Sequence, residues 1–321
     1  MNSRELELLR ILEAHSGEYV SGTKLANILG VSKPTLNRIV NALKKKGYII
    51  DSNPRKGYRL LPVDDLANAE FYLADLGTRL RYRVHYVEKC VTTQDIAATL
   101  AEQGAAEGTI VLAEEMSGGR GRLSRKWYAP RGGLWFTLIL RPHDTRYSQL
   151  LSLALGLGIV KGIENNLGIR TSLKWPNDVL YNEKKLAGIL VEGKIEVPYI
   201  KYILVGVGVN VNNEIPFDLR DTAISLKDIL KRHVPRIPLL RSMLVEIDKY
   251  YNILASRGDY KRIIIEWKNY SSTIGRRVKA ITVEGRTIVG KAVDIDKNGA
   301  LVLETPSGIE KIYAGDIIHL R

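Results

Sequence analysis

A turn and a helix start lie within five residues, Gly30 to Pro34, and they constrain the fold of the first sixty residues more than any other feature. Gly30 and Val31 favour a tight turn. Ser32 follows where a hydroxyl can cap a helix, and Pro34 falls in the first helical turn, where its missing N–H costs nothing. The chain can therefore place two helices side by side through a very short connection.

Apolar residues at helical spacing predict three helices in this region. The first covers residues 4–13 and ends before Gly17, the second follows the capping Ser21, and the third runs from Ser32 to Gly47. The side chains expected to point inward are Leu6, Leu8, Leu9, Ile11 and Leu12, then Leu25, Ile28 and Leu29, then Leu36, Ile39, Val40 and Leu43. Two short strands, 48–50 and 58–60, are expected next, around a turn with a basic tip.

Helices joined by a short turn and followed by such a hairpin are typical of a winged helix-turn-helix, whose second helix can lie in the major groove of DNA. Lys44, Lys45 and Lys46 would reach phosphates. The candidate DNA-binding residues are Ser32, Lys33, Thr35, Asn37, Arg38, Lys44, Arg55 and Lys56. A small helical protein-interaction module is the alternative.

Positive charge is concentrated in the same region. Residues 1–62 hold 11 Lys or Arg and 5 Asp or Glu, a net +6 on a fifth of a chain whose total is +13. A nucleic-acid partner explains this density, and a solvated basic surface is the alternative.

Length and composition indicate a protein of two or three domains. Of its 321 residues 45% are hydrophobic and 26% charged, as in globular proteins. No apolar run reaches the roughly 18 residues of a membrane span, and the N-terminus lacks the apolar core of a signal peptide. Cys90 is the single cysteine and cannot form an internal disulfide. We expect a cytoplasmic protein without a membrane partner.

From residue 63 onward helical and strand patterns mix, which indicates an α+β or α/β domain with a mixed sheet. Helices are expected at 71–79, 94–103 and 149–165, and strands at 82–87, 109–113, 133–140 and 200–211. The five His residues and Cys90 are scattered without ligand spacing, so no protein metal site is expected.

Residues 118–127 hold three glycines and four cations, a composition unsuited to a stable helix or strand. Glycines let backbone N–H groups approach an anion, and arginine can bind phosphate through two hydrogen bonds. The Walker A pattern is absent. A phosphate-binding loop is the functional interpretation, and a flexible basic surface loop is the alternative.

Residues 174–192 predict a hairpin flanked by two lysines. Pro176 keeps the residue before it out of helical geometry. Residues 179–181 and 185–192 read as strands around a turn at Asn182 to Lys184. Lys174 and Lys185 then lie on either side of Asp178 in sequence. Each lysine alone could also be a solvated surface charge.

The last fifty residues alternate in short segments, which predicts strands at 278–283, 287–293, 300–304 and 310–313 with turns near Gly285, Gly299 and Gly308. A small β-barrel fits this pattern, and taken by itself it would serve as a structural cap.

Three motifs follow one another along the chain: GRGR-x-x-RKW at 119–127, KWPND at 174–178 and KLAGILVE at 185–192. Together they resemble the biotin–protein ligase family of the BirA type, and the resemblance extends over the whole chain. It implies an α+β multidomain protein with a winged helix-turn-helix at 1–62, a mixed-sheet, class II synthetase-like ligase domain at 63–270 and an SH3-like β-barrel at 271–321. The activity implied is that of a biotin–[acetyl-CoA-carboxylase] ligase: ATP activates biotin to biotinyl-5′-AMP, and biotin passes to a lysine of a carrier-protein domain.

The same resemblance implies a site. Lys185, Arg120 and Arg122 are the implied catalytic residues, because they can neutralise biotin's carboxylate and the phosphates together. The implied biotin- and adenylate-binding residues are Val91, Thr92, Thr93, Met116, Ser117, Gly119, Arg120, Gly121, Arg122, Trp127, Lys174, Asn177, Asp178, Lys185, Gly188 and Asn210. Mg²⁺ would accompany ATP, held mostly by phosphate and water.

Three positions depart from the family pattern. Val91 to Thr93 stand where the family has Ser-Thr-Asn at the ureido group of biotin. Met116 stands where a glutamine usually holds biotin, a task that could pass to Ser117 or a backbone group. Ser124 replaces a glycine of the loop at residues 118–127, called the arginine loop from here on. This replacement should stiffen the loop.

The resemblance further implies operator DNA as a partner and a homodimer when the adenylate is bound, with biotin acting as the corepressor's precursor. Three alternatives stay open: a non-catalytic sensor of biotin or its adenylate, a lipoate–protein ligase, and a ligase that has lost specific DNA binding.

Overall fold

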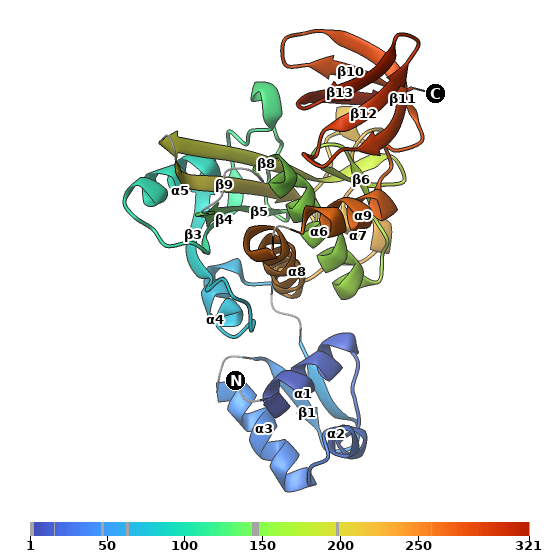
Figure 1. Cartoon of the computed structure of the whole chain (residues 1–321). Helices are drawn as coiled ribbons and strands as arrows, with labels where there is room; N and C mark the ends of the chain where they lie inside the picture. Colours follow the sequence, from blue (N-terminus) through green and yellow to red (C-terminus); the bar gives the residue numbers. More distant parts are fainter. Residues whose placement is uncertain are drawn as a thin grey trace.

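The computed structural model describes residues 3–15, 17–45, 48–61, 64–142, 148–196, 199–257 and 259–320. An N-terminal lobe lies at one end, a C-terminal sheet lies at the other, and a larger sheet with its helices lies between them (Figure 1). No helix in these ranges is both long and apolar enough to cross a membrane.

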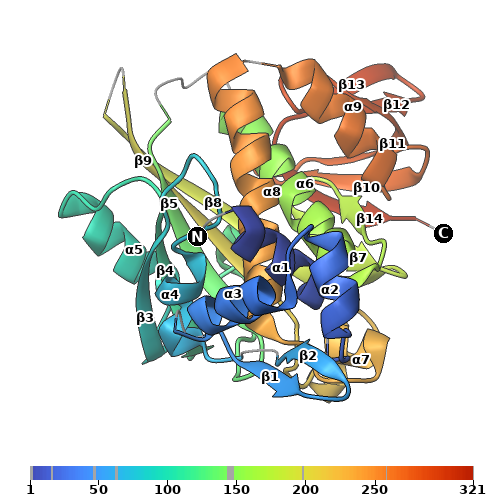
Figure 2. The same cartoon turned by 90° about the horizontal axis from the view of Figure 1, so that it is seen from below.

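The N-terminal lobe consists of α1 (Ser3–Ala14), α2 (Gly22–Ile28) and α3 (Lys33–Lys45), followed by the antiparallel strands β1 (Ile50–Asn53) and β2 (Gly57–Leu60). Ser21 caps α2 by accepting from the Lys24 backbone N–H at 3.1 Å, and Gly30 has a φ of +60° in the short turn. Viewed from below, the lobe lies in front of the rest of the chain (Figure 2). The predicted helix-turn-helix is confirmed.

Two details of this lobe were predicted wrongly. The side chain of Ile28 is 49% exposed rather than inward. The first strand begins at Ile50 and not at Tyr48, because Tyr48 is buried and packs edge-on against Tyr72, with ring centroids 5.7 Å apart. The described residues do not include Lys46, Gly47, Pro62 and Val63.

The central sheet has the strand order β3-β4-β5-β9-β8-β7-β6. Its strands are β3 (Arg83–Cys90), β4 (Thr109–Met116), β5 (Leu134–Leu140), β6 (Ser172–Lys174), β7 (Asp178–Tyr181), β8 (Lys184–Glu196) and β9 (Tyr199–Val209). β3 and β4 are parallel, whereas the other neighbours are antiparallel, so the predicted mixed sheet is confirmed.

Helices cover both faces of this sheet. They are α4 (Ala69–Leu73), α5 (Thr93–Glu102), α6 (Ser148–Leu167), α7 (Leu226–Leu230), α8 (Arg236–Arg257) and α9 (Tyr260–Tyr270), with short 3-10 turns at Leu66–Asn68, Arg122–Ser124 and Phe217–Leu219. Side chains alternate along β5, so Ile139 packs with α5 and Leu138 packs in the core on the opposite face. Gly158 and Gly162 let α6 approach α8, because an added Cβ would lie 2.7 Å and 2.4 Å from α8 backbone atoms.

The helix expected at 71–79 is wrong beyond Leu73. The backbone N–H groups of Arg79 and Leu80 instead donate to the buried carboxylate of Asp248 on α8, at 3.1 and 2.8 Å. A long-range bond therefore replaces the local helical bonds of this segment.

The C-terminal sheet holds β10 (Arg277–Thr282), β11 (Thr287–Ile295), β12 (Leu301–Thr305), β13 (Gly308–Ile312) and β14 (Gly315–His319), in the antiparallel order β13-β12-β11-β10-β14. The strand β14 was not predicted from the sequence. The end strands β13 and β14 are not paired with each other in the described chain, so a closed barrel is not confirmed.

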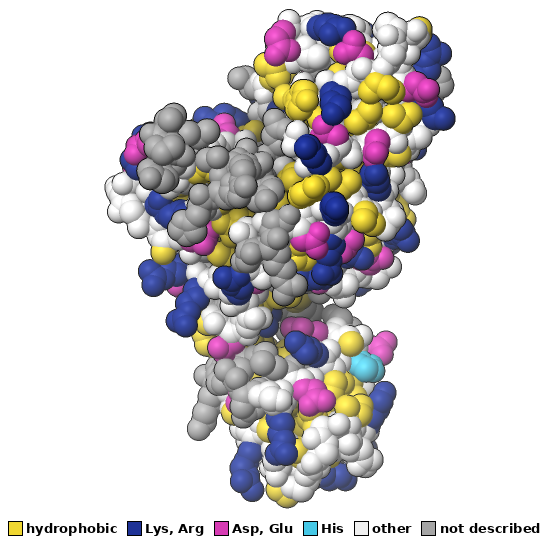
Figure 3. Space-filling view, in the orientation of Figure 1, with side chains coloured by type: hydrophobic (Ala, Val, Ile, Leu, Met, Phe, Trp, Pro, Cys, Tyr) yellow, Lys and Arg dark blue, Asp and Glu magenta, His cyan; other side chains and the backbone are white. Residues whose placement is uncertain are grey.

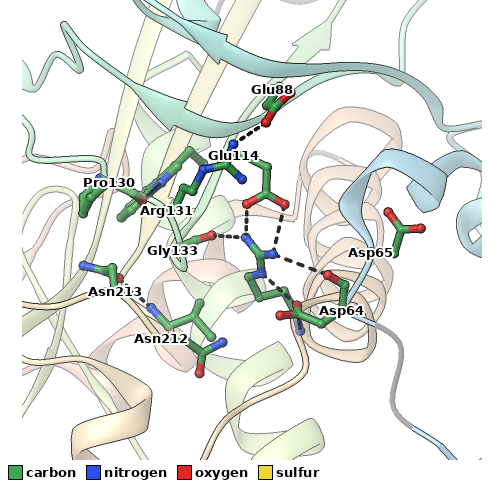
Figure 4. Close-up of polar contacts among 12 residues, drawn as sticks. Asp64, Asp65, Glu88, Glu114, Pro130, Arg131, Gly133, Asn212 and Asn213 are labelled. Atoms are coloured by element: carbon green, nitrogen blue, oxygen red, sulfur yellow. Dashed lines mark hydrogen bonds and ion pairs between the residues drawn. The ribbon is translucent and has the colours of Figure 1, made fainter.

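A buried arginine joins the segment after the N-terminal lobe to the central sheet. Arg236, 5% exposed at the start of α8, donates to Asp64 at 2.8 Å and to both carboxylate oxygens of Glu114 at 2.8 and 3.0 Å. It also donates to the carbonyl of Gly133 at 3.1 Å (Figure 4). The carboxylates of Glu114 and Asp64 outweigh the opposing effect of burial and raise the pKa of Arg236.

Candidate functional site

A cavity of about 430 Å³ lies where the N-terminus of α5, the arginine loop, the β7–β8 hairpin and β14 meet. Twelve of the predicted site residues line it: Thr92, Thr93, Met116, Arg120, Gly121, Arg122, Trp127, Lys174, Asn177, Asp178, Lys185 and Gly188. The fold thus brings together segments that sequence analysis could only place in order.

Four predicted residues do not line this cavity. The side chain of Val91 is 62% exposed, and Ser117 is exposed with its hydroxyl 3.4 Å from the Cys90 carbonyl. Gly119 is buried, and a Cβ there would lie 2.6 Å from the Trp127 carbonyl oxygen. Asn210 is buried and lines a neighbouring cavity.

Lys185 stands near the start of β8, where it lies opposite Leu180 of β7. Its Nζ lies 2.8 Å from Asp178 Oδ1 and 5.2 Å from the centre of the Trp127 ring. The hairpin turns through Asn182 and Glu183, both with positive φ. Asn177 holds the hairpin by donating its side-chain N–H to the Ile189 carbonyl at 2.7 Å.

Glycines make room for the walls of the cavity. A Cβ at Gly188 would lie 3.1 Å from the Trp127 ring and 3.2 Å from Lys185 Cε. A Cβ at Gly208 on β9 would lie 2.6 Å from the same ring. The Trp127 Nε1 atom is buried and has no hydrogen-bond partner in the described chain. It is therefore a donor available to a ligand.

Cations dominate the lining of the cavity. Six of its side chains are Lys or Arg, against the two carboxylates of Asp178 and Asp316. Burial lowers the pKa of Lys174 and of Arg122, although Asp178 partly opposes both shifts. Cations that are partly desolvated together favour an anionic ligand, which would replace the lost water.

The loop arginines already have protein partners. Arg120 pairs with Asp95 at 2.7 Å, Arg122 donates to the Gly315 carbonyl at 3.0 Å, and Arg125 pairs with Asp316. The last two contacts join the loop to β14, so the C-terminal sheet forms one wall of the cavity.

The lining residues that were not predicted from the sequence include Gln94 and, in the C-terminal sheet, Ile281, Asp316, Ile317 and Ile318. A sequence pattern could have identified Gln94 as a site residue. The polar run is Thr92, Thr93 and Gln94, shifted by one position from the predicted run that starts at Val91. No local pattern marked the C-terminal residues, which reach the cavity only through the pairing of β14 with β10.

A second cavity, of about 730 Å³, adjoins the first and shares six lining residues with it: Lys126, Trp127, Lys174, Asp178, Lys185 and Ile318. Its other lining residues include Asn210, the 215–223 segment, Arg276 and His319. A two-part ligand could therefore bind across Lys185 and Trp127.

In the N-terminal lobe, α3 and the β1–β2 turn border a third cavity, of about 420 Å³, whose lining includes Lys33, Asn37 and Arg55. Ser32, Lys33, Asn37 and Arg38 are exposed, whereas Thr35 is half-buried. The hydroxyl of Tyr58 donates to Asn37, and Lys44 donates to the Ser52 hydroxyl at 2.9 Å. Lys56 lies 5.6 Å from the Tyr19 ring centre. Figure 3 shows cations over the visible face of this lobe.

Three family models match successive parts of the chain. A helix-turn-helix domain matches residues 4–59, the biotin/lipoate A/B protein ligase family matches residues 88–210, and the biotin protein ligase C-terminal domain matches residues 273–320. These matches contain the N-terminal lobe, most of the central sheet and the C-terminal sheet.

Relatives match over nearly the full length. The bifunctional ligase/repressor BirA of Bacillus subtilis is 36% identical over 317 residues, 97% of each chain, and that of Escherichia coli is 29% identical over all of this chain and 98% of its own. The Aquifex aeolicus biotin protein ligase solved with biotin and ATP aligns with a TM-score of 0.66 and 31% identity, covering 74% of this chain and 99% of its own. The chain belongs to the bifunctional ligase/repressor BirA family.

Proposed function

We propose that this chain is a biotin–protein ligase that also represses transcription in response to biotin. It uses ATP to activate biotin as biotinyl-5′-AMP and transfers biotin to a lysine of a carrier-protein domain. The observation that carries the proposal is the cationic cavity in which Lys185 and the arginine loop meet across Trp127. Full-length relatives named as ligase/repressors support both activities.

In this proposal the ureido ring of biotin lies against the polar start of α5, at Thr92 and Thr93. The flat, glycine-lined space beside Trp127 accepts the apolar part of the ligand, and its carboxylate points toward Lys185. In this placement the ligand spans the cavity from the threonines at the start of α5 to the cations around Lys185. The geometry gives no support to a side-chain role for Val91, which is exposed outside the cavity.

Lys185, Arg120 and Arg122 act by charge. The biotin carboxylate attacks the α-phosphorus of ATP, a P–O bond forms, and pyrophosphate leaves with its electron pair. The three cations reduce the repulsion between carboxylate and phosphates and stabilise the charge that develops. The neutral amine of the carrier lysine then attacks the carbonyl carbon of the mixed anhydride, and AMP leaves.

The nucleotide is assigned to the second cavity, with Asn210 and Lys174 at its edge. Mg²⁺ enters as part of the MgATP substrate. In the described ranges no group of three His, Cys, Asp or Glu is placed to hold a metal, and Asp178 is already paired with Lys185. This donor set fits an ion held mostly by phosphate and water.

For the repressor activity, α3 enters the major groove of operator DNA with Ser32, Lys33, Thr35, Asn37 and Arg38 toward the bases. Lys44, Arg55 and Lys56 contact phosphates, and the β1–β2 hairpin serves as the wing. We further assign an SH3-like class to the C-terminal sheet, domain limits at 1–62, 63–270 and 271–321, and a homodimer that forms with the adenylate.

A mass-spectrometric biotinylation assay tests the ligase. The full chain is incubated with ATP, Mg²⁺, biotin and a carrier domain, and Lys185→Ala is compared with Lys184→Ala. Lys184 precedes it on the same strand and donates instead to the Arg220 carbonyl at 2.6 Å. We expect one added biotin mass, lost in Lys185→Ala and kept in Lys184→Ala.

Two results would replace the proposal with an alternative. Biotin binding without any mass gain would make the protein a sensor. A mass gain from lipoate in preference to biotin would make it a lipoate–protein ligase, an activity that the matched family model also covers.

A further inference from the structure

A cluster of charged and titratable side chains forms where the turn of the β7–β8 hairpin meets the C-terminal sheet. Glu183, in the turn, accepts two hydrogen bonds from Arg276, at 2.6 and 3.0 Å. Its Oε2 also lies 3.4 Å from Nδ1 of His319 on β14. All three residues line the second cavity together with Lys174 and Lys185. None of the three was predicted from the sequence as a site residue.

The other ring nitrogen of His319 reaches the opposite end of the segment between these two lysines. His319 Nε2 lies 3.3 Å from Oγ1 of Thr273. Thr273 is fully buried, and the same Oγ1 accepts from the backbone N–H of Trp175 at 3.1 Å. Trp175 directly follows the first lysine, and the turn at Glu183 lies two positions before the second. One imidazole therefore connects the surroundings of both lysines to the C-terminal sheet.

Both protonation states of His319 can keep these contacts. A carboxylate only accepts hydrogen bonds, so Nδ1 must carry a hydrogen that it donates to Glu183. A neutral ring then accepts at Nε2, and the Thr273 hydroxyl can donate there because its oxygen is the acceptor for Trp175. A charged ring donates from Nε2 to the same oxygen, since a hydroxyl has two acceptor lone pairs. The charge of His319 can therefore change without breaking the bridge.

The groups that face the imidazole disfavour its charged form. The His319 side chain is 10% exposed, and burial lowers its pKa below the ordinary value. Lys174 of β6 and Arg276 lower this pKa further, while Glu183 opposes them. A nucleotide in the same cavity brings several negative charges close to the ring. An anion near a histidine favours the charged form, so binding of the nucleotide should raise the pKa of His319.

We propose that His319 is a positioning residue for Lys174 and Lys185, and that it takes up a proton from solvent when the nucleotide binds. In the loaded site the imidazolium pairs with the Glu183 carboxylate, and this charged hydrogen bond holds the hairpin to the C-terminal sheet more firmly. Nucleotide affinity therefore increases as the pH falls. The inference rests on the proposed function, because it takes the second cavity as the nucleotide site.

Proton uptake is a readout that a purely structural role would not change. The full chain is titrated calorimetrically with α,β-methylene-ATP and Mg²⁺ in the presence of biotin, because this analogue cannot release pyrophosphate. Titrations at about pH 6.5 in buffers of different ionisation enthalpy give the number of protons taken up. We expect the wild type to take up at least about 0.3 proton more than His319→Asn, whose side chain can still donate to Glu183 but does not titrate.

His85→Asn is the matched control. His85 is exposed on β3, at the edge of the central sheet opposite to β6, and this variant should take up as many protons as the wild type. The same titrations give the Kd of the analogue at each pH. From about pH 6 to about pH 8 the Kd should rise more steeply in the wild type than in His319→Asn.

The positioning role is measured as kcat/KM for ATP in the biotinylation assay at about pH 8, where histidines are mostly neutral. His319→Leu loses both contacts and should lower kcat/KM roughly fivefold to tenfold. His319→Asn keeps a donor for Glu183 and should recover most of that loss. Proton uptake decides the inference even where His319→Leu fails to fold.

Equal proton uptake by the wild type and His319→Asn, with the analogue bound by both, would overturn the protonation of His319. An unchanged kcat/KM in His319→Leu would overturn its positioning role. Either result leaves the ligase proposal intact. Wild-type protein that neither binds the analogue nor transfers biotin would instead overturn the proposed function itself.

Discussion

At the scale of single residues, glycines decide how near the reactive groups come to each other. Gly188 and Gly208 leave the space that Trp127 and Lys185 occupy, because a side chain at either position would meet the indole ring. Gly208 is the tighter of the two, with an added Cβ 2.6 Å from Trp127. The indole ring must therefore move if this position is filled.

Gly208→Ala should lower kcat/KM for biotin transfer by roughly 10- to 100-fold, since displacements of about 1 Å have effects of this size. Gly193→Ala is the control, because a Cβ there would meet its nearest neighbours at an ordinary 3.7 Å. Steady-state kinetics on both variants measure the difference. Equal rates for the two variants would show that the position of Trp127 does not matter.

At the scale of elements, the start of α8 is held by charge as well as by packing. Arg236 contacts Asp64, which follows the N-terminal lobe, and Glu114, which lies two residues before Met116 on β4. Because Arg236 and Glu114 are both buried, removing the guanidinium leaves the Glu114 carboxylate without this partner. Removing one partner of a buried ion pair destabilises a protein more than replacing both partners with well-packed apolar residues.

Arg236→Ala should reduce the free energy of unfolding by about 3–5 kcal/mol. Urea denaturation of Arg236→Ala and Arg232→Ala measures this, since Arg232 is an exposed arginine just before the same helix. We expect the second variant to stay within about 0.5 kcal/mol of the wild type. A loss below about 1 kcal/mol in Arg236→Ala would mean that water replaces the guanidinium.

At the scale of the whole molecule, charge is distributed unevenly. The first 62 residues carry a net +6 of the total +13, and cations of α3 and the β1–β2 turn lie on a surface separate from the ligand cavity. Binding to DNA and binding of biotin can therefore be changed independently by substitution.

Arg55→Ala should weaken binding to duplex DNA and reduce the slope of log K against log salt by about 1, as expected for one lost phosphate contact. Fluorescence anisotropy between low and moderate salt measures the slope. Lys291→Ala, an exposed change in the C-terminal sheet, should leave the slope unaltered. An unchanged slope in Arg55→Ala would remove the hairpin from the DNA interface.

Much of this arrangement follows from local sequence. The caps at Ser21 and Ser32, the turn at Gly30 and the hairpin that carries Lys185 depend on residues a few positions apart, so their signals lie within one short stretch. The motifs at residues 119–127, 174–178 and 185–192 likewise contain nine of the twelve predicted residues that line the cavity, because the residue types that bind anions are few.

Only the tertiary structure decided the remainder. Gln94 meets Glu192 across 98 positions, and Arg236 meets Asp64 across 172. Likewise β14 reaches the cavity because it pairs with β10. The helix predicted at 71–79 ends at Leu73 and gives way to turns and bends, because Asp248 supplies other partners for the backbone of Arg79 and Leu80. Contacts between distant residues depend on how the whole chain folds back on itself. The hydrophobic pattern within a single segment carries no information about them.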